Sequence, residues 1–234
     1  MKKPTSTIMS LAALLVSAAA ANAQNVNVTV DPSALTLGYM NWQPTAYTLA
    51  KYPTDGGTGG SSWGLSALQA NFSGTTLTLQ PNINTYAVGV GYWTNPDGTG
   101  ANQMDANIYN ETTGTYVNTT LTFSFDVTAN SLTAPYTAQA FIKDFNSTYS
   151  SYTQQTVALT MGMESVTFTT SANAGDHIQY GFEMFGPDAA PGSSAANESV
   201  VITPVTAVPE PAVWTWAGSG GALILALVRR GRKS

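Results

Sequence analysis

The chain of 234 residues contains no cysteine and a single histidine, His177. The absence of cysteine excludes disulfides, thiolate nucleophiles and iron–sulfur clusters. One histidine is too few for the usual catalytic zinc ligands, and it offers a single base for any Ser-His-Asp triad. We therefore expect neither zinc nor thiol catalysis, and we interpret His177 as an ordinary strand-edge residue.

Charge is also scarce, at 9% of residues. An average soluble domain carries about a quarter, and exposed helix faces are where charged residues gather, so a helical cytosolic protein is excluded. Residues 24–207 hold twelve acidic and two basic side chains, a formal charge of −10, and no arginine. Such a surface repels nucleic acid and anionic lipid headgroups.

The basic residues gather instead at the two ends. Lys2 and Lys3 precede a short apolar run over residues 11–21, and Ala21 and Ala23 bracket a small-x-small cleavage site. This is the pattern of a secretory signal peptide, which signal peptidase removes. We expect three segments: a signal peptide (1–23), a folded body (24–207) and a C-terminal signal (208–234).

The C-terminal segment begins its second apolar run at residue 212 and ends it at residue 228. Seventeen residues in a helix span about 25 Å, slightly less than a hydrocarbon core of about 30 Å. The positive-inside rule places the basic tail in the cytoplasm and the body outside. The run therefore predicts a transmembrane helix, followed by Arg229, Arg230 and Arg232.

Immediately before this run stand Val208, Pro209, Glu210 and Pro211. The order of motif, apolar span and arginine-rich end resembles the PEP-CTERM sorting signal. The resemblance implies export by a Gram-negative, exopolysaccharide-producing bacterium, processing by an exosortase, and release to the cell surface or extracellular matrix. The alternative is a permanent anchor with a proline-bearing linker.

The body reads as β-strands, because apolar and polar residues alternate with a period of two. The runs are separated by glycine, proline and aspartate turns, and no stretch has helical spacing. About ten short strands predict two packed antiparallel sheets, as a jelly roll or alternatively an immunoglobulin-like sandwich. The expected strands cover residues 26–30, 77–79, 86–92, 121–127, 138–142, 157–161, 166–168, 178–184 and 200–202.

Residues 39–205 loosely resemble the jelly-roll carbohydrate-binding modules of secreted bacterial polysaccharide enzymes. The resemblance rests on strand order and on the stretches 121–127, 140–145 and 177–181. It implies a glycan-binding role for the body.

Aromatic side chains are the best candidates for sugar contacts. A ring face stacks on sugar C–H groups, while amides bond the hydroxyls. Trp93 leads, because it falls outside the apolar phase of its expected strand and precedes a loop. The alternative, for Trp42 and Trp63 above all, is core packing. The candidates are Trp42, Trp63, Tyr92, Trp93, Tyr149 and Tyr152.

Oxygen-bearing side chains around one glycine-rich loop suggest a structural calcium site. Calcium prefers carboxylate, amide and carbonyl oxygens, although the same residues also make turns without a metal. The candidate ligands are Asn95, Asp97, Asn102 and Asp105.

Four carboxylates on or beside strands could form the pair that a glycosidase needs. The polar phase of Asp126 and Glu183 favours simple solvent exposure instead. The four are Asp126, Asp144, Glu164 and Glu183.

Three functions agree with these patterns. The first is an exported, non-catalytic surface or matrix protein associated with exopolysaccharide. The second is a glycan-binding module, and the third is a polysaccharide-active hydrolase or lyase. The expected partners are polysaccharide and, during export, signal peptidase and an exosortase.

The sorting signal generates a direct prediction. Glu210→Ala should leave the protein uncleaved and membrane-bound, because the processing enzyme would lose its recognition motif. Mass spectrometry of the wild-type extracellular form should show a chain that ends before Arg232. An intact C-terminus in that form would contradict the assignment.

Overall fold

The computed structural model describes residues 23–44, 59–86 and 91–205. The predicted sorting signal (208–234), and all of the predicted signal peptide except Ala23, lie outside these residues. The strands are β1 (Gln24–Thr29), β2 (Leu37–Pro44), β3 (Gly59–Ser62), β4 (Ala70–Ser73), β5 (Thr76–Leu79), β6 (Asn102–Thr113), β7 (Thr119–Asn130), β8 (Thr137–Phe145), β9 (Tyr152–Ala158), β10 (Gly162–Thr169), β11 (His177–Pro187) and β12 (Val200–Pro204).

The only helical element in the described ranges is the 3-10 turn η1 (Ala195–Asn197). No described helix is long and apolar enough to span a bilayer.

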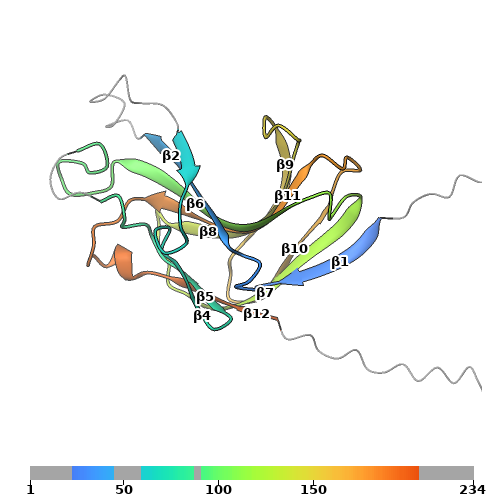
Figure 1. The fold of residues 1–234 in the computed structure, drawn as a ribbon. Helices are drawn as coiled ribbons and strands as arrows, with labels where there is room; N and C mark the ends of the chain where they lie inside the picture. Colours follow the sequence, from blue (N-terminus) through green and yellow to red (C-terminus); the bar gives the residue numbers. More distant parts are fainter. Residues whose placement is uncertain (1–22, 45–58, 87–90, 206–234) are drawn as a thin grey trace, which may run out of the picture.

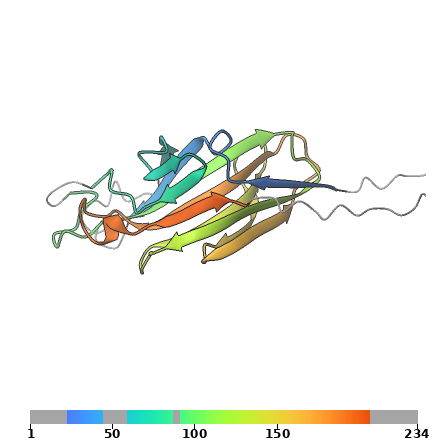
Figure 2. The same cartoon turned by 90° about the horizontal axis from the view of Figure 1, so that it is seen from below.

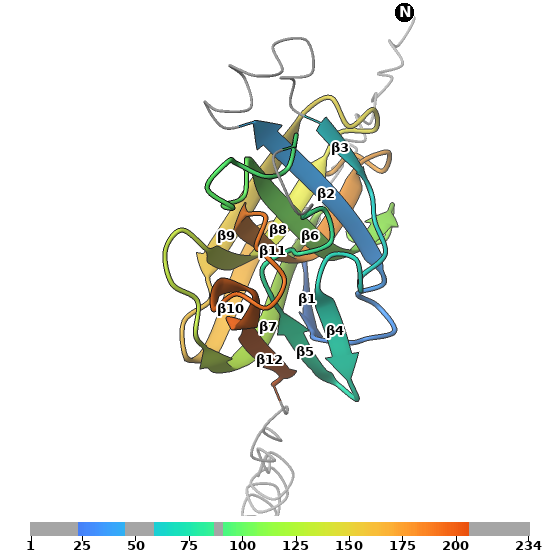
Figure 3. The same cartoon turned by 90° about the vertical axis from the view of Figure 1, so that its left-hand side faces the viewer.

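The strands form two six-stranded sheets that lie as two layers (Figures 1 and 3). Sheet A has the order β1-β7-β12-β5-β4, with β10 on the other edge of β7; sheet B has the order β3-β2-β6-β11-β8-β9. The prediction of an all-β, two-sheet sandwich is confirmed. All pairs are antiparallel except one: β1 runs parallel to the first half of β7, and β12 pairs with the second half (Figure 2).

Aromatic rings from the central strands of both sheets meet in the core. Phe123 and Phe125 on β7 face Tyr180 and Phe182 on β11. The ring centroids of Phe123 and Phe182 are 5.0 Å apart, and those of Phe125 and Phe182 are 5.1 Å apart. All four side chains are buried. The alternation predicted for residues 121–127 and 178–184 therefore places these rings on the inner faces.

Two of the expected strands differ from the structure where it describes them; residues 87–90 of the run 86–92 lie outside the described residues. At the described ends of the run 86–92, Tyr86, Gly91 and Tyr92 lie in no strand. The chain forms a local loop there instead, in which Gly91 N donates to Thr94 O at 3.2 Å. The amide of Gly91 therefore bonds a residue close in sequence and not a neighbouring strand. The run 157–161 overlaps β9 only at its first two residues, because that strand ends at Ala158.

The sequence patterns missed β2, β3, β4 and β6. The longest of them, β6, has twelve residues, of which only Met104, Ala106 and Ile108 are apolar side chains buried in the core. Their partners in the alternation are amides and carboxylates, which weaken the apolar signal.

The aromatic core sets a stability prediction. Phe182→Ala should lower the free energy of unfolding by about 3–5 kcal/mol, because it removes a fully buried ring and leaves a cavity. Urea unfolding of residues 24–207, which contain both sheets, measures this. As a control, Thr122→Ala on the outer face of sheet A should cost about 1 kcal/mol or less, since it loses one hydroxyl contact with Thr167. Similar losses for both variants would contradict this account of the core.

Candidate functional site

The face of sheet B that turns away from sheet A is built by strand alternation. Even-numbered residues of β2, β6, β8 and β11 enter the core, as with Met40, Met104, Ile142 and Phe182. Odd-numbered residues therefore point outward. The register sets them side by side across neighbouring strands. We call this surface the outer face of sheet B.

A continuous chain of hydrogen bonds crosses this face. Asn41 Nδ2 donates to Asp105 Oδ2 at 3.1 Å, and Asn107 Nδ2 donates to Asp105 Oδ1 at 2.8 Å. Lys143 Nζ donates to Asn107 Oδ1 at 2.7 Å and to Glu183 Oε2 at 2.8 Å. Side chains from β2, β6, β8 and β11 are thus held in one network.

Lys143 is the only lysine or arginine among the described residues. It forms an ion pair with Glu183, and their side chains are 9% and 14% exposed. Gln139 Nε2 also donates to Glu183, and the Lys143 ammonium lies 4.0 Å from the centroid of the Phe141 ring. The single cation of the face is therefore fully engaged.

The pKa of the Asp105 carboxyl is affected by burial and by the nearby negative charge. Burial raises the pKa of its carboxyl, and the nearby Glu183 carboxylate raises that pKa further. Lys143 and the amides of Asn107 and Asn41 act in the opposite direction. The network therefore keeps a partly desolvated carboxyl beside a second one.

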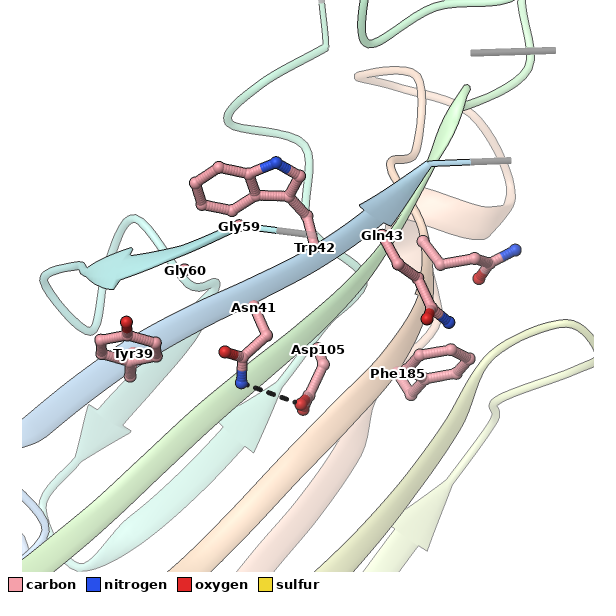
Figure 4. A pocket seen from close by; sticks show the side chains of 9 residues that line it. Tyr39, Asn41, Trp42, Gln43, Gly59, Gly60, Asp105 and Phe185 are labelled. Carbon is pink, nitrogen blue, oxygen red and sulfur yellow. Dashed lines mark hydrogen bonds between the residues drawn. The ribbon is translucent and has the colours of Figure 1, made fainter. Parts of the chain in front are cut away.

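A hollow of about 330 Å³ opens at the β2 side of the network (Figure 4). Gly60 lies close against the Tyr39 ring, because a Cβ atom there would be 2.7 Å from it. The hollow combines aromatic rings with amides and one carboxylate. Its lining consists of Tyr39, Asn41, Trp42, Gln43, Gly59, Gly60, Gln103, Asp105 and Phe185.

An aromatic cluster occupies the opposite end of the face. The Tyr149 ring stacks on His177, with centroids 4.2 Å apart and planes 11° apart, and Phe145 lies 4.7 Å from Tyr152. Tyr149 Oη donates to Glu111 Oε1 at 2.8 Å. Burial, followed by the contact with Glu111, raises the pKa of Tyr149 to about 12. Tyr149 and Tyr152 are 49% and 51% exposed, so ring surface remains free for a ligand.

The structure divides the predicted sugar contacts into two groups. Tyr149 and Tyr152 lie on the outer face of sheet B. Trp42 packs against the core and also borders the hollow. Trp93 is half-buried and packs against the core, with its ring edge-on to Trp42 at 5.8 Å and to Tyr92 at 5.0 Å.

Trp63 also packs against the core. Its indole nitrogen donates to Ser61 Oγ at 2.8 Å.

The four predicted calcium ligands do not form one donor set. Asn102 and Asp105 lie on opposite faces of β6, since Asn102 is fully buried while Asp105 lines the hollow. Asp97 accepts hydrogen bonds from the backbone and hydroxyl of Thr99 in its own turn, which lower its pKa. Turn formation therefore accounts for Asp97.

The predicted carboxylate pairs are also dispersed. Asp126 lies on β7 in sheet A, and Glu164 on β10 accepts a bond from Thr160. Asp144 is buried on β8, where burial raises its pKa and Ser171 N donates to it at 2.7 Å. Only Glu183 reaches the outer face of sheet B, where Asp105 is the carboxylate near it.

The run from Gly60 to Gly64 has the letters of a nucleophile elbow, Gly-x-Ser-x-Gly. Its serine, Ser62, ends the edge strand β3, whereas an elbow requires a turn from a strand into a helix. His177 lies on β11, separated from β3 by β2 and β6. A triad is not assembled there.

Sequence reasoning missed most of the network. The members of the network are far apart in the sequence, and only the register between strands brings them together. No local spacing in the sequence therefore predicts the network. The missed residues are Tyr39, Asn41, Asn107, Gln139, Lys143 and Phe185.

The ion pair generates a test of the network. Lys143→Met should lower the free energy of unfolding by about 3 kcal/mol, because it leaves the carboxylates of Glu183 and Asp105 without a nearby cation on a partly desolvated surface. It should also raise the pKa of Asp105, which Lys143 lowers. Urea unfolding and an NMR titration of the Asp105 carboxyl measure the two effects. The double variant Lys143→Met/Glu183→Gln should recover part of the loss, and simple additivity would contradict the coupling.

Comparison with known proteins gives little information about this site. No family model matches the chain, and no curated protein matches it. One solved structure with some likeness contains the CBM22-1 and GH10 modules of Clostridium thermocellum endo-1,4-beta-D-xylanase 10B with xylohexaose. It is 16% identical, with a TM-score of 0.24, and the match covers 60% of this chain and 28% of that one. A match at this level carries no argument about function.

Proposed function

We propose that the chain is an exported, non-catalytic protein of the cell surface or extracellular matrix that binds polysaccharide on the outer face of sheet B. The observation that carries the proposal is the hydrogen-bonded polar network with exposed aromatic rings at both ends. Phe185 stands by the hollow and Tyr152 stands at the far end, 36% and 51% exposed.

This arrangement suits the two chemical sides of a sugar. Aromatic faces stack on the C–H surface, and amides and carboxylates pair with hydroxyl groups. The network also holds its members in fixed positions before any ligand arrives, which reduces the entropy cost of binding. A glycan lying along the strands would meet rings at both ends and hydrogen-bonding groups between them, because Phe185 and His177 stand at opposite ends of β11.

The charge of the face selects the class of glycan. Asp105, Glu111 and Glu183 lie on it, and Lys143 is already paired with Glu183. An anionic chain would meet carboxylates with no free cation among the described residues. The face therefore favours neutral or weakly basic polysaccharide.

Strand order supports the jelly roll over the immunoglobulin-like alternative. From β5 to β12, eight strands divide four to each sheet, and most connections cross from one sheet to the other. Among these eight strands, β8 and β9 are the only consecutive pair that lies within one sheet. A jelly roll consists of eight strands in two such sheets.

The terminal segments supply the proposed location. We infer removal of residues 1–23 by signal peptidase and processing of residues 208–234 by an exosortase. These steps rest on the apolar runs, the basic ends and the Pro209-Glu210-Pro211 motif.

A glycan hydrolase or lyase is the second candidate, for one specific reason. Asp105 has a raised pKa and lies near Glu183, as an acid and its partner do in glycosidases. Release of new reducing ends from neutral glycans would support it. Loss of that release in Asp105→Asn would assign the acid.

Affinity electrophoresis through neutral polysaccharide gels tests binding. Wild-type protein should be retarded, with a Kd in the micromolar to millimolar range, about −8 to −4 kcal/mol. Tyr152→Ala and Phe185→Ala should each weaken binding about tenfold, because each removes one stacking surface. Retention should persist in high salt, since stacking does not depend on ion pairs.

Met163→Ala is the matched control. Met163 is 80% exposed, but it lies on β10 in sheet A, so binding should be unchanged. If the wild type migrates freely in every neutral glycan, or if the control loses binding equally, the proposal fails.

A further inference from the structure

The end of the sandwich beyond β11 buries a group that the network on the outer face does not use. Asp188 directly follows β11 and is 1% exposed. Its backbone N donates to Asn102 O at 3.4 Å, which sets Asn102, the first residue of β6, directly beside it. Alternation turns both side chains inward, away from the outer face of sheet B.

Neither carboxylate oxygen of Asp188 has a hydrogen-bond partner among the described residues. A buried carboxylate without a partner is costly, because it loses its hydration and gains nothing in exchange. Burial accordingly raises the pKa of Asp188 to about 7.

Three further buried oxygens in this region also have no donor: Thr85 Oγ1, Asn95 Oδ1 and Asn102 Oδ1. The two amides cannot simply be reversed. Asn102 Nδ2 donates to Tyr92 O at 2.9 Å, and Asn95 Nδ2 donates to Gly100 O at 3.0 Å. Their nitrogens face carbonyls, so their oxygens must face the other way.

Contacts tie these groups to Asp188. The Thr85 hydroxyl lowers the pKa of Asp188, which places it beside the carboxylate, although no hydrogen bond of ordinary geometry joins the two. Gly100 packs onto the Asp188 main chain, because a Cβ atom there would lie 2.2 Å from the Asp188 carbonyl oxygen. Asn95 is bonded to Gly100, and Asn102 is bonded to Asp188 itself.

We propose that this end of the sandwich holds a structural calcium ion, bound by side-chain oxygens of Thr85, Asn95, Asn102 and Asp188. Five oxygens without donors, and no nitrogen or sulfur ligand, match the preference of calcium, which takes six to eight oxygens. No three His, Cys, Asp or Glu side chains gather anywhere in the described ranges, so a zinc-type set is not formed there. The site rests on different observations from the glycan-binding face.

With a single carboxylate, affinity is modest. Calcium sites of extracellular modules have Kd values of about 10⁻⁴–10⁻³ M, and we expect this range here. The ion neutralises the buried carboxylate of Asp188. It also links the loop around Asn95 to the end of β11.

Thermal unfolding after chelation tests the site. Adding calcium at about ten times its Kd should raise the Tm of the wild type by roughly 3–6 °C, and magnesium should raise it less. Terbium should bind in place of calcium and give luminescence sensitised by the indole of Trp93, which follows the Tyr92 carbonyl that anchors Asn102. No Tm response together with no sensitised luminescence overturns the proposal.

Two variants locate the ion. Asp188→Asn should abolish the calcium response, and Thr85→Val, which removes a single oxygen, should weaken affinity several-fold and so serves if Asp188→Asn fails to fold. Asp97→Asn is the matched control in the same loop and should respond as the wild type does. If Asp188→Asn or Thr85→Val keeps the full response, or if Asp97→Asn loses it, the ligand set is wrong.

A stable protonated carboxyl is the competing explanation for Asp188. In that case Asp188→Asn should raise the Tm in the presence of chelator, and calcium should leave the Tm of the wild type unchanged. That combination overturns the calcium site.

Discussion

The contact between β7 and β11 across the core is the constraint on which the rest of the structure depends. Phe123 and Phe125 meet Phe182 at about 5 Å, and all three rings are fully buried. Because side chains alternate along a strand, burying these rings fixes the orientation of every other residue on both strands. Slipping β11 by one residue would put Glu183 into the core. The hydrophobic contact thus decides which polar groups reach the outer face.

That face can be polar because the network pairs its members with each other. Asp105 receives hydrogen bonds from two amides, and Glu183 receives the ammonium of Lys143. In a body with so little positive charge, one lysine at the centre holds two carboxylates together without a second cation. The pairing allows a dense group of hydrogen-bonding side chains to stand beside exposed rings without mutual repulsion dispersing them.

The sequence predicts β7, β8 and β11, but it misses β2 and β6, which supply Asn41, Asp105 and Asn107 to the outer face of sheet B. Residues 121–127 and 178–184 alternate clearly, because their inner residues are large and apolar. β6 was missed, since most of its outer positions are amides and carboxylates and its apolar residues in the core are only three. The outer face of sheet B owes much of its polar character to this strand. Tyr149 and Tyr152 were found because their segment is locally polar, whereas the partners of Asp105 come together only through register.

The polar oxygens on the outer face of sheet B and those around Asp188 differ in their hydrogen-bond partners. This difference suggests different roles. On the outer face the hydrogen bonds of the network are exposed or part-buried, except the buried bond from Lys143 to Asn107, so a ligand can exchange with solvent at little cost at most of these groups. Around Asp188 the oxygens are buried and have no donor in the described structure. Water cannot readily exchange there, and each empty acceptor would cost about 1–3 kcal/mol of stability. The proposed reversible binding of a glycan suits the first arrangement and the proposed resident ion suits the second, so the two proposals are separable for one sandwich.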